Sequence, residues 1–473
     1  MLLINSLNYN YMFQNFSVFN VIFVLSFVAA CVIFYLKVKK IARNINLGKD
    51  ISIKDRKSYR WKLMFKVSVF QQKMMKNPIA GVLHILVYAG FILVNIEMAD
   101  IMVDGSIGTH RFLYHALNEG GFLSFLGVGF MYPYFIGAFE IFGTCVFLAC
   151  AVFICRRWIL KVKRFWNPEM TTWPRWDATI ILISEILLMS AFLSANAADT
   201  VLQTINGVGY GHFAEVKLGT LPVSGILVPL YSHFSQGTLI FIERFGWWFH
   251  IIGVFAFLNY IPYSKHFHVF LSFPNVYYSK LEPKTKMNNM ESITREVKLM
   301  LDPSAPMPDA NAPVEKFGAA DIKDLTWKQL MDAFTCTECG RCTSKCPANI
   351  TGKKLSPRKI EMDTRDRVEE IGCGIDKKGI DYTDDKDLFK YIDQEELWAC
   401  TTCNACTEEC PVNIDHPSII LDMRRYLVME KSTAPTALNM MFKNIENNGA
   451  PWQYSPEDRL LWTQELYFEN KNS

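Results

Sequence analysis

The sequence CTECGRCTSKCP occupies residues 336–347, and a second copy of its spacing, CTTCNACTEECP, occupies residues 400–411. Each copy has three cysteines at two-residue intervals and a fourth cysteine directly before a proline. This arrangement is typical of paired [4Fe–4S] clusters, in which the fourth cysteine of each motif ligates the other cluster. The spacing therefore predicts two [4Fe–4S] clusters, which together form a path for electrons.

The crossover divides the eight cysteines into two ligand sets. The first set is Cys336, Cys339, Cys342 and Cys410, and the second is Cys400, Cys403, Cys406 and Cys346. The alternative is a pair of Cys₄ zinc sites, since zinc also binds four sulfurs at C-x-x-C spacing. A zinc knuckle needs only two cysteines, however, and both copies here have a third cysteine and the proline. The pattern therefore favours iron–sulfur clusters.

The chain combines a membrane part with a soluble part. Of its 473 residues 50% are hydrophobic, and the net charge of +3 indicates no particular partner. We expect an all-α fold, with a bundle of five transmembrane helices (residues 1–283), a linker (284–319) and a helical dicluster ferredoxin domain (320–473). The five stretches long enough to cross a bilayer are Phe16–Leu36, Ile79–Met98, Pro133–Cys155, Ala178–Ala197 and Gly237–Pro262.

Basic residues orient the predicted bundle. Thirteen Lys or Arg lie between residues 37 and 76 and six lie between residues 156 and 175, whereas the other two connections carry only Arg111 and Lys217. Cytoplasmic loops are enriched in Lys and Arg. We therefore expect the N-terminus outside, the cluster domain in the cytoplasm and the protein in the cell membrane.

Histidines are the candidate haem ligands, because ionisable side chains in membrane helices are usually functional. His84 lies near the cytoplasmic end of the second predicted helix, and His250 and His268 lie eighteen residues apart on the fifth helix and its extension. Eighteen residues make about five turns of a helix and return to the same face. Pro262 lies between the two histidines and can kink or break the helix there. We pair His84 with His268 as axial ligands of one b-type haem, with His266 as the substitute ligand.

His250 needs another partner if it is to hold a second haem. The second helix has Val94, not a histidine, ten residues after His84. The remaining histidines of the outer segments are alternatives whose spacing does not mark them as ligands: His110, His115, His212 and His233. One haem b is expected, and a second stays open.

Two known families share these features. The membrane part resembles the gamma subunit of respiratory nitrate reductase, a five-helix dihaem cytochrome b. His84, His250 and His268 match three of that family's four haem histidines, and Val94 departs from the fourth. Residues from about Phe317 to Trp462 resemble the dicluster ferredoxin domain of heterodisulfide reductases and of the glycerol-3-phosphate dehydrogenase anchor subunit. Adjacent cysteines do not occur in the sequence, so the Cys-Cys-Gly domains with which heterodisulfide reductases perform catalysis are missing.

The resemblances imply an electron-transfer subunit whose substrate-converting site lies on a partner. That partner is expected to be a cytoplasmic subunit with a Cys-Cys-Gly domain or an electron-transferring flavoprotein. A membrane quinone is expected near the outer half of the bundle. Neither a P-loop nor a Rossmann fingerprint is present, and nucleic acid is not an expected partner. The candidates for moving the protons of the quinone are Glu97, Asp100, Glu140 and Glu185.

Two other functions remain open. In one, the chain is a membrane anchor whose haem and clusters relay or sense redox state without a quinone site. In the other, it is a zinc-stabilised membrane scaffold. Cys373 lies outside both cysteine motifs and is expected to be a spare thiol.

Overall fold

The computed structural model describes residues 17–109, 111–117, 123–205, 221–302, 304 and 316–464. Within these ranges the regular structure is helical, apart from one isolated bridge between Lys49 and Thr326. The predicted all-α fold is thus confirmed. Five helices are long and apolar enough to cross a membrane, as the sequence predicts. They are α2 (Val18–Ile45), α4 (Pro78–Ile107), α6 (Tyr132–Ile154), α7 (Thr172–Ile205) and α9 (Gln236–Tyr260).

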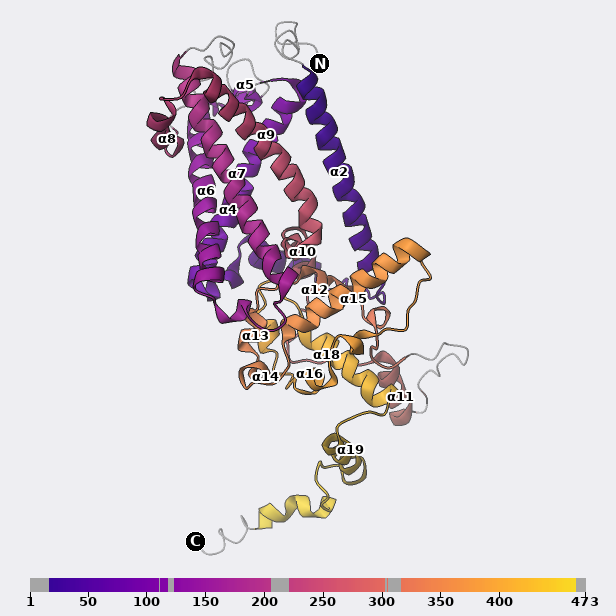
Figure 1. Ribbon diagram of the computed structural model, residues 1–473. Helices are drawn as coiled ribbons and strands as arrows, with labels where there is room; N and C mark the ends of the chain where they lie inside the picture. The colour runs from indigo at the N-terminus through magenta and orange to yellow at the C-terminus, as the bar shows by residue number, and fades with distance from the viewer. Residues whose placement is uncertain are drawn as a thin grey trace, which may run out of the picture.

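The five long helices stand side by side as one bundle (Figure 1). Helix α7 packs against both α6 and α9, and α4 packs against α6. The outward side chains are apolar, and on α2 they include the exposed Leu25, Val28 and Val32. So large an apolar surface is unfavourable in water, and the protein is therefore associated with a membrane. Short helices flank the bundle: α3 (Lys57–Met64), α5 (Phe112–Leu117), α8 (Ser224–Tyr231) and α10 (His268–Tyr277).

The fifth long helix does not continue to His268 as a straight helix. Helix α9 ends at Tyr260, and two 3₁₀ turns, Ile261–Tyr263 and Lys265–Phe267, separate it from α10. Between the two turns Ser264 is extended, with φ −119° and ψ 154°. A proline lacks the N–H that an interior helical position needs, and Pro262 lies in the first turn. The expected same-face projection of His250 and His268 along one helix is therefore wrong.

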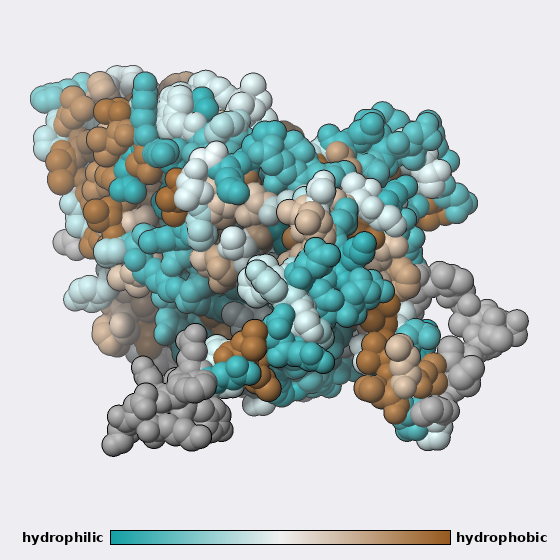
Figure 2. Space-filling model, turned by 90° about the horizontal axis from the view of Figure 1, so that it is seen from below, coloured by the Kyte–Doolittle hydropathy of each residue, from teal (hydrophilic) through white to brown (hydrophobic). Residues whose placement is uncertain are grey.

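The soluble part lies at one end of the bundle, below it in Figure 1. The linker contains one described helix, α11 (Glu291–Leu301), while residues 305–315 lie outside the described ranges. Seen from below, the face turned away from the bundle is largely hydrophilic (Figure 2). The other helices are α12 (Trp327–Thr335), α13 (Arg341–Lys345), α14 (Pro347–Ile350), α15 (Pro357–Lys378), α16 (Gln394–Trp398), α17 (Ala405–Glu409), α18 (His416–Arg425) and α19 (Thr436–Asn448).

The two parts share one hydrophobic core. Ile41 of α2 and Phe257 of α9 belong to the same buried cluster as Leu330 of α12 and Ile371 of α15. Helix α15 also approaches α2 closely, since a Cβ added at Gly372 would collide with the Asn44 side chain. The cluster domain is therefore packed onto the end of the bundle.

Helix α10 joins the bundle to the cluster domain through a buried amide. Asn275 is 0% exposed. Its Nδ2 donates to Asp332 Oδ1 at 2.9 Å and to the Val412 carbonyl at 3.0 Å. Its Oδ1 accepts from Lys328 Nζ at 3.0 Å. One side chain thus connects α10, α12 and the segment after Cys410.

We predict that Asn275→Ala destabilises the junction between bundle and cluster domain. The substitution leaves three buried polar groups short of a partner, and each unsatisfied group costs about 1–3 kcal/mol. Thermal unfolding of the purified protein in detergent should show a melting temperature several degrees lower. The matched control is Asn439→Ala, because that amide bonds the Ala434 carbonyl at an exposed position. Equal melting temperatures for the two variants would contradict the prediction.

Candidate functional site

The two cysteine motifs form loops with the same backbone course. In the first loop Glu338 (φ 51°) and Gly340 (φ 71°) are left-handed, and α13 begins directly afterwards. In the second loop the corresponding residues, Thr402 (φ 54°) and Asn404 (φ 60°), are left-handed too, and α17 follows. Left-handed residues reverse the chain sharply. The sequence repeat is therefore also a structural repeat.

Backbone N–H groups of this region point at cysteine sulfurs. The Thr402 N–H donates to Cys400 Sγ at 3.4 Å, and the Ile414 N–H donates to Cys410 Sγ at 3.4 Å. All eight motif cysteines are free of disulfide bonds. Hydrogen bonds to sulfur are among the features that tune iron–sulfur clusters, so these loops have the character of cluster-binding loops.

Cys410, the last cysteine of the second motif, lies beside the first cysteine loop. Cys410 lines one small cavity together with Cys336, Cys339 and Cys342. Burial raises the pKa of the Cys336 and Cys342 thiols. Metal ligation requires the thiolate, so a cation must replace the proton at such a site. These four cysteines are the first predicted ligand set, and their ligation of one cluster stays a prediction.

The second predicted set lies nearer the surface. The thiols of Cys400 and Cys406 are close enough to Cys346 to interact electrostatically with it, and Cys400 also interacts with Cys403. Cys346 and Cys406 are buried, whereas Cys403 is exposed. The second set therefore reaches the solvent at Cys403.

The zinc alternative needs the same cysteines in a different arrangement. A Cys₄ zinc site holds four sulfurs about 2.3 Å from one ion, whereas a [4Fe–4S] cluster offers a separate iron to each thiolate. In the described part of the chain, no three His, Cys, Asp or Glu side chains are gathered around a single metal position.

A cavity of about 480 Å³ extends from the membrane part to the first cysteine loop. Its wall includes His84 of α4, His250 of α9, His266 of the turn Lys265–Phe267 and His268 at the start of α10. The same wall includes Cys339 of the first loop. All four predicted haem ligands and one predicted cluster ligand thus face one space.

His84 and His268 lie together in this cavity. Their ring centres are 6.5 Å apart, and two imidazoles bound to one metal through nitrogens about 2 Å away have ring centres roughly 6 Å apart. His268 Nδ1 is hydrogen-bonded to the Lys265 carbonyl at 3.0 Å, which leaves Nε2 free, as in most metal-bound histidines. His84 Nδ1 is buried and finds no hydrogen-bond partner among the described residues. The pair fits the two axial positions of a haem.

His266 and His250 have different surroundings. The His266 ring centre lies 5.5 Å from that of His268 and 5.5 Å from that of Phe257, so its role as substitute haem ligand stays a prediction. His250 is buried, and its Nδ1 is hydrogen-bonded to the Leu188 carbonyl at 3.0 Å. Its Nε2 is therefore also free for a ligand in the cavity.

The described outer histidines do not supply a second ligand beside His250. His115 and His233 are exposed, and neither lines the cavity. His110 and His212 lie outside the described residues. Val94 lines the cavity on α4. The second haem remains an open prediction.

Arginines line the cavity beside the histidines. Arg157 Nε and Nη2 and Arg164 Nε are buried, and none has a hydrogen-bond partner within the described ranges. Unpaired buried cations are costly, and the two propionate carboxylates of a haem would pair with them. The cavity therefore offers both groups that a haem b requires: histidine nitrogens for its iron and arginine cations for its carboxylates. Sequence reasoning used these arginines only to orient the bundle and did not anticipate their place in the cavity wall.

The four membrane acids have different settings. Glu140 and Asp100 accept backbone N–H bonds at 2.8 and 2.6 Å, which hold the adjoining loops. Glu97 is buried, and its Oε2 has no partner in the described part of the chain. Glu185 lines the cavity that also contains His250. Of the four acids, Glu185 is the one placed to exchange a proton with a molecule in that cavity.

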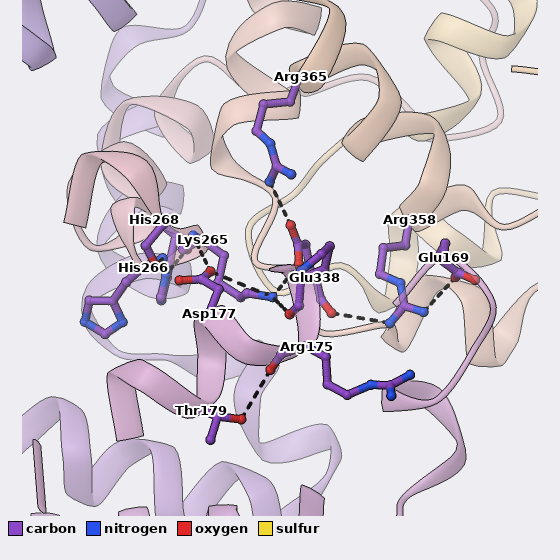
Figure 3. A network of polar contacts seen from close by, with 12 residues as sticks. Glu169, Arg175, Asp177, Thr179, Lys265, His266, His268, Glu338, Arg358 and Arg365 are labelled. Atoms are coloured by element: carbon purple, nitrogen blue, oxygen red, sulfur yellow. Dashed lines mark hydrogen bonds and ion pairs between the residues drawn. The ribbon is translucent and has the colours of Figure 1, made fainter. Parts of the chain in front are cut away.

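An ion-pair network connects the wall of the cavity to the first cysteine loop (Figure 3). Lys265 Nζ pairs with Glu338, and Arg365 Nη1 donates to the same carboxylate at 2.8 Å. Burial raises the pKa of the Glu338 carboxyl, but Lys265 and Arg365 together hold it below its ordinary value. Sequence reasoning missed this pair. The sequence feature that could have indicated it is the charged Glu338 in the first motif, at the position where the second motif has Thr402.

A family model of the 4Fe-4S dicluster domain matches residues 335–414. The match supports two [4Fe–4S] clusters, as the cysteine spacing predicts. No solved structure matches the chain.

Three of the curated relatives are named as oxidoreductases or reductases. The probable iron-sulfur-binding oxidoreductase FadF of Bacillus subtilis is 28% identical over 92% of this chain and 59% of its own length. The EtfAB:quinone oxidoreductase of Syntrophomonas wolfei is 26% identical over 85% of this chain and 53% of its own length. One component of the dihydromethanophenazine:CoB–CoM heterodisulfide reductase of Methanosarcina acetivorans is 30% identical over 31% of this chain and 37% of its own length. The chain spans a little over half the length of the first two.

We predict that Cys410→Ser removes one cluster and spares the other. On the crossover assignment the lost cluster is that of the first motif, so iron and acid-labile sulfide should fall to about half of their values in the unmodified protein. Electron paramagnetic resonance of the reduced protein should retain the signal of one cluster. Cys373→Ser is the control, because Cys373 is exposed and outside both motifs. Unchanged iron in Cys410→Ser, or equal loss in both variants, would refute the ligand set.

Proposed function

We propose that the chain is the membrane subunit of a quinone-linked oxidoreductase. It transfers electrons between a membrane quinone, one haem b, two [4Fe–4S] clusters and a cytoplasmic partner subunit. The observation that carries this proposal is the shared cavity, whose wall contains His84 and His268 as well as Cys339. The relatives described as an iron–sulfur oxidoreductase and as an EtfAB:quinone oxidoreductase support it.

In this proposal His84 and His268 hold the haem, and Arg157 and Arg164 pair with its carboxylates. When bound, the haem and the clusters accept and release one electron at a time. The chain itself fixes the ligands, because the Lys265 carbonyl orients the His268 ring through Nδ1. Apolar side chains such as Val254 line the cavity around the histidines.

The two cysteine sets give the electron path an order. Cys339 of the first set lines the cavity, whereas Cys403 of the second set is exposed. In this proposal the cluster of the first set is the inner station, the electron carrier nearer the haem, and the cluster of the second set is the outer station, the carrier nearer the solvent. A soluble partner would exchange electrons at the surface around Cys403.

The bundle crosses the cell membrane five times in this proposal, with the N-terminus outside and the cluster domain in the cytoplasm. The basic segment before α4 supports this orientation, because it contacts the cluster domain. Lys73 Nζ donates to the Cys410 carbonyl at 3.1 Å, and Lys76 Nζ pairs with Glu408 at 2.6 Å. Cytoplasmic loops are rich in such residues.

The quinone is placed at the end of the cavity that contains His250. Phe91 and Ile92 line the cavity and are exposed on the outside of the bundle, where they would meet lipid. Conversion between quinol and quinone moves two electrons and two protons. Glu185 lines the cavity and is the proposed proton carrier, since acids in membrane helices usually face a cavity or a partner.

The partner is proposed to be a cytoplasmic subunit that carries a Cys-Cys-Gly domain or an electron-transferring flavoprotein. The relatives named for EtfAB and for heterodisulfide reductase support these two classes. The largely hydrophilic face of the cluster domain in Figure 2 suits a soluble partner. The substrate-converting site would then lie on that partner.

We predict that His84→Ala removes the absorbance of haem b from the purified protein and leaves the cluster signals unchanged. His84 is one of two proposed axial ligands, and alanine cannot ligate iron. His233→Ala is the control, because His233 is exposed and does not line the cavity. A haem spectrum that survives His84→Ala would show that the pairing with His268 is wrong.

The proposed quinone reaction is tested with a menaquinol analogue. We expect anaerobic addition of the analogue to the purified full-length chain to reduce haem b. Glu185→Gln should slow this reduction at least about 10-fold, a typical contribution of a positioned proton carrier being 10²–10⁴-fold, with the haem spectrum unchanged. Glu457→Gln, at an exposed position, should react like the unmodified protein.

Absence of haem reduction in the unmodified protein would favour the alternative function, an anchor that relays or senses redox state without a quinone site. Reduction at the same rate in Glu185→Gln and in the unmodified protein would leave the quinone function standing and exclude Glu185 as the proton carrier.

A further inference from the structure

Lys265 contacts the two proposed redox sites with its two ends. Its Nζ pairs with the Glu338 carboxylate, and Glu338 lies between Cys336 and Cys339 in the first cysteine loop. Its backbone carbonyl accepts the hydrogen bond from His268 Nδ1 at 3.0 Å. A single residue therefore joins Glu338 of the cysteine loop to His268, as Figure 3 shows.

The two cysteine loops differ at this point. Their backbones follow the same course, and position three of each motif is left-handed, with φ 51° at Glu338 and φ 54° at Thr402. A left-handed conformation is uncommon for a residue with a side chain, and neither backbone explains why a carboxylate is needed. The first loop lines the cavity of the membrane part. The carboxylate therefore belongs to the loop that faces the histidines.

The pair is held tightly in place. The side chains of Lys265 and Glu338 are 9% and 3% exposed. Lys265 Nζ also donates to the Pro174 carbonyl at 2.5 Å, and the Lys265 N–H donates to Asp177 Oδ2 at 3.1 Å. Arg365 Nη1 holds the second oxygen of Glu338 at 2.8 Å. Neither charge can turn away to water, so each acts on its surroundings at short range and in low dielectric.

We propose that Lys265 and Glu338 are a positioning pair that couples His268 to the first cysteine loop. The inference rests on the proposed haem site and goes further by naming the residues that set the relation between haem and inner cluster. Lys265 fixes the orientation of the His268 ring through its carbonyl and the location of the loop through its ammonium group. Its charge and that of Glu338 act on both redox centres.

The coupling predicts the direction in which each substitution moves a midpoint potential. Adding an electron makes a centre more negative, so a nearby cation favours the reduced state and a nearby anion opposes it. Lys265→Met removes the cation and should lower the potentials of haem b and of the first-motif cluster. Glu338→Gln removes the anion, leaves Lys265 in place and should raise both. The second-motif cluster, beyond the first, should move least.

The experiment is a redox titration of the purified full-length protein. Haem absorbance and electron paramagnetic resonance of the clusters are followed together. Lys265→Arg, which keeps the charge, should restore most of the Lys265→Met shift. Lys316→Met is the matched control, because it removes a lysine that pairs with Asp324 at 2.6 Å and does not line the cavity. The double variant Lys265→Met/Glu338→Gln should show a shift that differs from the sum of the single shifts, as expected for interacting residues.

The outcomes separate the inference from the function on which it rests. Opposite shifts in Lys265→Met and Glu338→Gln, with none in Lys316→Met, support the coupling. Unchanged potentials of haem and inner cluster in both variants overturn it while the haem function stands. An unmodified protein without haem b overturns the proposed function and the coupling together. If Lys265→Met does not fold, the near-isosteric Glu338→Gln decides, and an unshifted potential there refutes the proposal.

Discussion

A buried charge is costly unless an opposite charge lies beside it, and an ion pair of this kind joins the bundle to the cluster domain. Glu338 projects from the first cysteine loop, and Lys265 projects from the connection between α9 and α10. Their pairing, extended by Arg365, keeps the loop against the membrane part. Asn275 of α10 makes a second buried polar contact between the two parts. Its amide donates hydrogen bonds to Asp332 of α12 and to the backbone of the segment after Cys410. The apolar core shared by α2, α9, α12 and α15 then completes the contact.

Much of this architecture could be predicted because the signals are local. Cluster ligation depends on spacings of two or three residues, and a membrane helix depends on a continuous apolar run. The five long helices and the clustering of Cys410 with the first loop agree with that reasoning. The exact course from His250 to His268 could not be predicted, because a helical projection assumes regular geometry that Pro262 interrupts.

The residues that sequence reasoning missed act over long separations. Lys265 and Glu338 are 73 positions apart, and no local pattern links them to each other. Arg157 and Arg164 were counted as part of a charge bias, although their buried nitrogens face the cavity. Pairing of this kind becomes visible only when the fold brings distant segments together. A charged residue within a cluster motif is the one feature that pointed to it.

The asymmetry between the two cysteine loops has a chemical consequence for the whole protein. The first loop is enclosed by the bundle, whereas the second presents Cys403 to solvent. A surface thiolate site that a partner can approach is open to dioxygen as well, and exposed thiolates are the ones that oxidise first. The outer station would therefore be the first to decay in air, while the inner station survives behind its cover of helices. Vulnerability to oxygen and access for the partner are thus two results of the same exposed edge.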